Sequence, residues 1–150
     1  MKNLERPIKM SFKLKFAKMY DNEIFQQYGI KPVVEDFFVA EEGKFCVADG
    51  VTRDSIFGEA IPYPKNREEV ENWIAVYPNP SGAYLAAKIC ADTFIDKLVQ
   101  YSKEEVNEEL IFQIVQKINQ KIADINKGRK IDYLANDYYG CVAVGGYIIE

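Results

Sequence analysis

The sequence contains no histidine among its 150 residues. This absence excludes a Ser-His-Asp triad, a Cys-His pair and any zinc site built on imidazole ligands within the chain. What remains is chemistry by carboxylates, hydroxyls, lysine and bound metal ions. Sites made only of oxygen ligands favour magnesium, manganese or calcium over zinc or copper.

Long apolar runs and an excess of positive charge are also missing. No apolar run approaches the ~18 residues of a membrane span, and residues 1–7 lack the apolar core of a signal peptide. The chain carries 19 basic and 23 acidic residues, for a formal net charge of −4, which argues against binding to nucleic acid. We therefore expect neither a membrane nor a nucleic-acid partner.

Cysteine is scarce and odd in number. Cys46, Cys90 and Cys141 are far apart in the sequence, and each lies in an apolar context. Such residues are typically buried, reduced thiols rather than disulfide partners or nucleophiles. This use of cysteine predicts a cytoplasmic protein.

The composition fits one globular domain. The chain is 48% hydrophobic, and a domain of this length can bury about 70% of its unfolded surface. The sequence has no internal repeat and no low-complexity segment. We predict a single domain over residues 1–150.

The chain is organised around residues 31–50, which contain two short apolar runs. Residues 37–40 and 45–48 have the length of strands and are continuously apolar, which predicts strands covered on both faces. The linker 41–44 has the length and the glycine of a hairpin loop. A hairpin returns the chain, so carboxylates at its two ends meet at one edge of the sheet, where a divalent metal would compensate their charge.

The segments on either side of the hairpin are less regular. Residues 12–16 alternate apolar and basic side chains, which predicts a strand with one wet face, and residues 20–30 are interpreted as strand plus loop. Residues 51–80 contain four prolines and one short helix at 67–73. This stretch is either a flap over the acidic edge or an insertion with no role in the chemistry.

Two helices and a strand follow. Ser81 caps a helix that extends to about residue 100. Polar residues recur at every fourth position of this helix and form one narrow solvent-exposed stripe, the wet stripe. The second helix opens with the capping box Ser102 and Glu105 and stops at Gly128. Residues 141–149 are predicted as a buried strand, bulged at its two glycines. The order predicts an α+β fold with an antiparallel sheet and two antiparallel helices outside it.

The acidic strand ends resemble the metal-dependent protein serine/threonine phosphatases of the protein phosphatase 2C family. That family opens with Arg-x-x-x-Glu-Asp, then a strand, a turn and a strand ending in Asp-Gly. Here Lys31 stands for the arginine, Glu35 and Asp36 follow it, and Asp49-Gly50 ends the second strand. The two helices follow in matching order, as does a glycine, residue 140, before the last strand.

The resemblance implies a fold, a metal site and a reaction. It covers the N-terminal half of the family's domain, and so implies half of a four-layer α-β-β-α sandwich. Asp49 would bridge two Mg²⁺ or Mn²⁺ ions, Gly50 would offer its carbonyl oxygen, Glu35 and Asp36 would bind metal directly or through water, and Lys31 would contact phosphate. The implied reaction is hydrolysis of phosphoserine or phosphothreonine in proteins by a metal-activated water.

Departures from the family pattern point to a half-site. The further aspartates of the family's metal cluster belong to its C-terminal half, and Val51 replaces a histidine that many members carry. We therefore predict a weak metal binder that is poor or inactive as a phosphatase alone. The alternative is an inactive phosphatase-like module for protein interaction or regulation. A half-sandwich also predicts a homodimer or pairing with the missing half.

The sequence does not fit the motif of the haloacid dehalogenase family. That motif needs an aspartate nucleophile two residues before Asp49, and this position is Val47.

Overall fold

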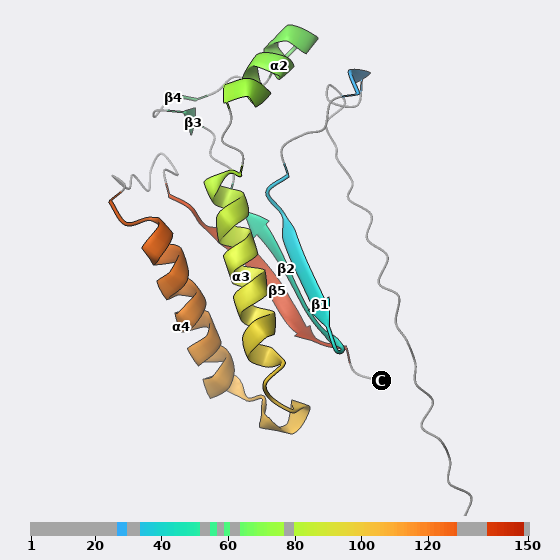
Figure 1. Ribbon diagram of the computed structural model, residues 1–150, viewed down its shortest axis with the longest axis vertical. Helices are drawn as coiled ribbons and strands as arrows, with labels where there is room; N and C mark the ends of the chain where they lie inside the picture. Colours follow the sequence, from blue (N-terminus) through green and yellow to red (C-terminus); the bar gives the residue numbers. More distant parts are fainter. Residues whose placement is uncertain are drawn as a thin grey trace, which may run out of the picture.

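Over the residues that it describes in full elements, the computed structural model gives an α+β fold with a three-stranded antiparallel sheet and the three α-helices α2, α3 and α4 (Figure 1). The predicted strand at residues 12–16 and the predicted phosphate contact Lys31 lie outside the described residues. Of the region interpreted as strand plus loop, Gln27 is helical and the next two residues form a turn. The structure describes residues 27–29, 34–51, 55–56, 59–60, 64–76, 80–128 and 138–148.

The central hairpin forms as predicted. Strands β1 (Phe37–Glu41) and β2 (Lys44–Gly50) pair antiparallel, from Phe37 opposite Ala48 to Glu41 opposite Lys44. The turn consists of Glu42 and Gly43, with φ angles of 47° and 75°. Two successive positive φ angles are typical of the tight turn whose twist matches that of the flanking strands. This turn therefore fixes the register that brings the other ends of the strands together.

The third strand completes the sheet without a bulge. Strand β5 (Cys141–Tyr147) pairs antiparallel with β2 in an unbroken register, so the sheet order is β1-β2-β5. The predicted bulge at the two glycines is wrong. Gly145 instead makes room for a neighbour, because a Cβ there would lie 2.7 Å from Cε1 of Phe94. A glycine in a strand often marks such a close approach.

The two faces of the sheet differ in burial. On β2, Cys46 and Ala48 are 1% and 0% exposed, whereas Val47 between them is 45% exposed. On β5, Val142 and Val144 are 64% and 70% exposed. The prediction of strands covered on both faces is wrong, as is that of a buried last strand. We call the face that carries Val47, Val142 and Val144 the open face.

Helix α3 (Gly82–Leu98) covers the opposite face and contacts all three strands. The predicted cap is confirmed, because Oγ of Ser81 accepts a hydrogen bond from the backbone N–H of Tyr84 at 3.1 Å. Small side chains let the helix approach the sheet closely. The predicted wet stripe is confirmed in Lys88 and Asp92, which form an ion pair. The small buried residues of α3 are Ala83, Ala86, Ala87 and Ala91.

Helix α4 (Glu108–Ile125) runs beside α3 in the opposite direction, as predicted (Figure 1). It buries Ile114 and Ile118. Its predicted start is wrong. The capping box of Ser102 and Glu105 opens only a short 3₁₀ turn, η1 (Lys103–Glu105), and α4 is capped instead by Asn107. Of the three α-helices described, none is long and apolar enough to cross a membrane.

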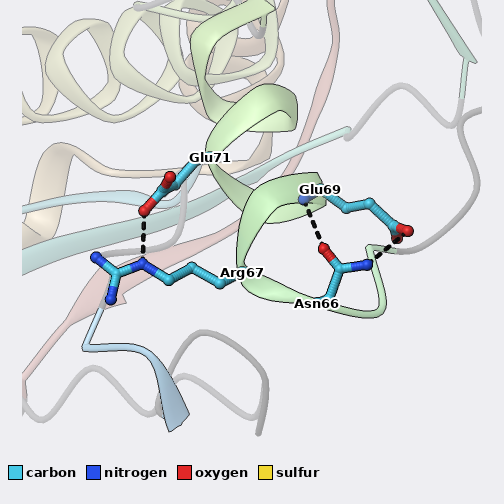
Figure 2. A network of polar contacts seen from close by, with 4 residues as sticks. All are labelled: Asn66, Arg67, Glu69 and Glu71. Atoms are coloured by element: carbon cyan, nitrogen blue, oxygen red, sulfur yellow. Dashed lines mark hydrogen bonds and ion pairs between the residues drawn. The ribbon is translucent and has the colours of Figure 1, made fainter.

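The segment between β2 and α3 contains more regular structure than the sequence predicts. Strands β3 (Ser55–Ile56) and β4 (Glu59–Ala60) form a small antiparallel ladder. The predicted short helix is confirmed as α2 (Arg67–Val76). Figure 2 shows its first turn, where Oδ1 of Asn66 accepts from the N–H of Glu69 at 3.0 Å. Nε of Arg67 contacts Oε1 of Glu71 at 2.7 Å on the same helix.

Candidate acidic site at one end of the sheet

The hairpin brings three predicted carboxylates to one end of the sheet. Asp49 is the penultimate residue of β2, and Asp36 immediately precedes β1. Because Phe37 pairs with Ala48, the strand register places Asp36 next to Asp49. Glu35 is held there as well, since its carbonyl oxygen accepts a hydrogen bond from the N–H of Gly50 at 3.3 Å. The predicted meeting of Asp36 and Asp49 is confirmed, and the structure places the backbone of Glu35 at the same end.

The electrostatics of Asp49 reflect this crowding. Loss of surrounding water raises its pKa, the protonated form can donate a hydrogen bond to Asp36, and the charges of Asp36 and Glu35 add to the effect. Two carboxylates that share a site disfavour joint ionisation unless a cation lies between them. Asp36 and Asp49 are exposed, whereas Glu35 is buried. The pair therefore presents concentrated negative charge to solvent.

Gly50 gives this site a rigid base. A Cβ at this position would lie 2.4 Å from the carbonyl oxygen of Ala83 and 2.9 Å from that of Glu35. The end of β2 is thus pressed against the first turn of α3. The next residue, Val51, donates its N–H to the carbonyl oxygen of Gly140 at 2.9 Å, so β2 and β5 stay joined beyond the acidic end.

Asn126 anchors the start of β5, and sequence reasoning missed it. Its side chain is buried just after α4. Oδ1 accepts from the N–H of Tyr139, and Nδ2 donates to the carbonyl oxygens of Tyr139 and Ile122, each at 2.9 Å. The only local signal is an asparagine two residues before the glycine that ends the helix. These bonds position the chain that leads to Gly140 and β5.

The carboxylates at the acidic end meet only part of the coordination that a hard divalent cation requires. Mg²⁺ is commonly bound through one or two carboxylates, with water or phosphate oxygens at its other positions. Asp36 and Asp49 supply that minimum. Within the ranges that the structure describes, no group of three or more histidine, cysteine, aspartate or glutamate side chains is arranged to hold a metal ion.

The three cysteines are unpaired thiols, as the sequence predicts, and they also share one core. All three are free, with Cys46 and Cys90 buried and Cys141 half-buried. Although they are far apart in sequence, all three belong to the core between α3 and the sheet.

Comparison with family models, with curated proteins and with solved structures gives no match for this chain. The interpretation of the acidic end therefore depends on its own residues.

Proposed function

We propose that the acidic end of the sheet is a divalent-cation site of the kind used by metal-dependent protein serine/threonine phosphatases of the 2C type. The observation that carries this proposal is the placement of the Asp36 and Asp49 carboxylates side by side, with the pKa of Asp49 raised by its surroundings. Two carboxylates that share a site favour a bound cation, because the cation stabilises the state in which both are ionised. The chain has no histidine to serve as an alternative general base.

In this proposal each residue has a limited task. Asp49 and Asp36 bind the cation, and the buried Glu35 supports it directly or through water. Gly50 keeps the strand end in place against α3 and is proposed to offer its carbonyl oxygen. Mg²⁺ or Mn²⁺, when bound, would activate a water for attack on a phosphoserine or phosphothreonine of a protein substrate.

The open face supports a second part of the proposal. Val142 and Val144 are exposed on the same face of the sheet as Asp49, because Asp49 pairs with Val142. A second sheet packed on this face would produce an α-β-β-α arrangement of four layers. That sheet could come from another copy of the chain or from a complementary half, and it would bring further carboxylates to the acidic end. We therefore propose that the chain alone hydrolyses phosphate esters poorly.

The experiment measures Mn²⁺ binding and hydrolysis of p-nitrophenyl phosphate by the full chain. Asp49→Asn is expected to abolish Mn²⁺ binding and any Mn²⁺-dependent hydrolysis. The matched control is Asp96→Asn, an exposed aspartate on the wet stripe of α3, which is expected to behave as the unmodified chain. Activity that survives Asp49→Asn would remove the catalytic assignment.

A second candidate function is a phosphatase-like module that binds another protein and has no activity. The observation that favours it is the exposed apolar surface formed by Val47, Val142 and Val144, since such patches often mark interaction sites. Sedimentation at high protein concentration, together with the Mn²⁺ binding measurement, distinguishes the binding module from the enzyme. Association that Val144→Lys abolishes, with no Mn²⁺ binding at any concentration, would favour the module over the enzyme.

A further inference from the structure

Three thiols from different elements converge beneath α3. Cys46 lies on β2, Cys141 begins β5, and Cys90 lies in the middle of α3. In the strand register Cys46 pairs with Gly145 and Cys141 with Gly50, so both strand thiols are on the face that α3 covers. Cys90 belongs to the same buried cluster as Cys46, and Cys141 packs against that cluster.

The three thiols differ in their readiness to react. The interactions with Cys141, and then with Cys46, lower the pKa of Cys90, while burial opposes this effect. The interaction with Cys90 raises the pKa of Cys46, and burial adds to this effect. The thiolate is the reactive form of cysteine. Cys46 and Cys141 lie four residues apart along the β2–β5 ladder, because Cys141 is opposite Gly50. Cys90 on α3 is therefore the thiol placed to react with either of them, and its lowered pKa favours it as the nucleophile.

Access distinguishes the two partners of Cys90. Cys46 lies on the central strand and is fully buried, whereas Cys141 lies on an edge strand and is half-buried. Sγ of Cys141 is 3.6 Å from the carbonyl oxygen of Ala86, which lies one turn before Cys90 on α3. A small oxidant that enters from the edge of the sheet thus meets the Cys141 side of the cluster first.

We propose that Cys90 and Cys141 form a redox site that closes as a disulfide between α3 and β5 on reaction with a peroxide, while Cys46 stays reduced. Sulfur of Cys90 attacks one peroxide oxygen, the O–O bond breaks, and the hydroxide released takes up the proton that Cys90 has lost. Sulfur of Cys141 then attacks the sulfenic acid on Cys90, the S–O bond breaks, and the hydroxide leaves with the proton of Cys141. Two thiols lose two electrons and two protons, and hydrogen peroxide becomes two waters.

The disulfide joins elements that meet beside the acidic end, because Cys141 lies opposite Gly50 in the register. It also closes a long loop of the chain, which restricts the unfolded state. We expect the oxidised chain to unfold at a higher urea concentration than the reduced chain. This inference stands whether or not the acidic end binds a cation.

The test treats the folded full chain with hydrogen peroxide, alkylates the remaining thiols and maps the peptides without reductant. The expected result is one linked pair, Cys90 with Cys141, and one alkylated thiol, Cys46. Cys46→Ser is expected to keep the same linkage, and Cys141→Ser to lose it. Because the mapping of the unmodified chain identifies the pair, the result does not depend on the folding of any variant.

Three outcomes would overturn the proposal: no linkage within the chain, a linkage between Cys46 and Cys90, or disulfides only between chains. The same treatment in concentrated urea serves as the control for the fold, and it is expected to give mixed pairings. If the Cys90–Cys141 pair forms no more selectively in the folded chain than in urea, the proposed site does not exist.

Discussion

The two faces of the central sheet carry similar residues and have different surroundings. On β2, Cys46 and Ala48 point toward α3 and are buried, while Val47 points to the open face and is substantially exposed. On β5, Val142 and Val144 belong to the open face, whereas Cys141 packs into the core beneath α3. Apolar character alone therefore does not identify the covered face.

The face covered by α3 stabilises the fold, whereas the open face is available for function. Burial of apolar surface under α3 contributes to stability, whereas exposed valines contribute little of this kind. The acidic residue Asp49 lies on the open face, opposite Val142. The proposed cation site and the exposed apolar surface are therefore adjacent, and a partner that covers one is placed to influence the other.

The largest expected difference between the faces is in the cost of truncation. Ile95 of α3 is fully buried in the core cluster, and we expect Ile95→Ala to lower the free energy of unfolding by about 2–5 kcal/mol because it leaves a cavity. Val144→Ala on the open face is expected to change it by less than about 0.5 kcal/mol. Urea unfolding of the monomeric chain measures both. Equal losses would mean that the open face is also covered.

A second contrast uses glycines of the two faces. Gly50→Ala would place a methyl group against backbone oxygens of Ala83 and Glu35, and is expected to cost about 3 kcal/mol of stability. At Gly146 on the open face, the added methyl group would meet only the Phe45 ring at 3.7 Å. We expect Gly146→Ala to be nearly neutral in the same unfolding experiment. A tolerated Gly50→Ala would contradict the tight contact between β2 and α3.

A third prediction concerns the anchor of β5. Asn126→Ala removes three hydrogen bonds and leaves the backbone groups of Tyr139 without this partner, and we expect a loss of about 2 kcal/mol. Asn119→Ala, an exposed position on α4, is the matched control and is expected to change little. Hydrogen exchange of β5 amides should accelerate in Asn126→Ala. Unchanged exchange would show that other contacts hold the strand.

The smallest expected effect is the pH dependence contributed by Asp49. Its folded-state pKa is raised, so the folded chain binds this proton more tightly than the unfolded chain does. Stability from this group is therefore present below its unfolded pKa and is lost as pH rises through the folded value. We expect Asp49→Asn to be slightly more stable than the unmodified chain at neutral pH, with the difference vanishing in acid. If the stability difference between Asp49→Asn and the unmodified chain grew in acid, the folded-state pKa of Asp49 would be lowered rather than raised.

The elements that sequence analysis predicts correctly are those with local signals. The turn at Glu42 and Gly43, the cap at Ser81 and the helical periodicity of residues 82–98 each lie within a few neighbouring residues. The convergence of Asp36 and Asp49 follows from the hairpin alone. This part of the candidate site was predictable because one short connection determines it.

The features that sequence analysis gets wrong depend on contacts between distant segments. A run such as residues 45–48 is apolar whether one face or both are covered, and Gly145 looks like a bulge until Phe94 is placed beneath it. The capping box at Ser102 is real but serves a single 3₁₀ turn. The meeting of Cys90 with the two strand thiols has no local signal, because each thiol comes from a different element.

The most direct test of the proposed cation site is an NMR titration of the Asp49 carboxyl group, with and without Mg²⁺. Without Mg²⁺, we predict a pKa above the ordinary value of 3.8, and Asp36→Asn should lower it. With Mg²⁺ the pKa should fall, because the cation stabilises the charged carboxylate. An ordinary pKa that neither Asp36→Asn nor Mg²⁺ changes would contradict the shared site.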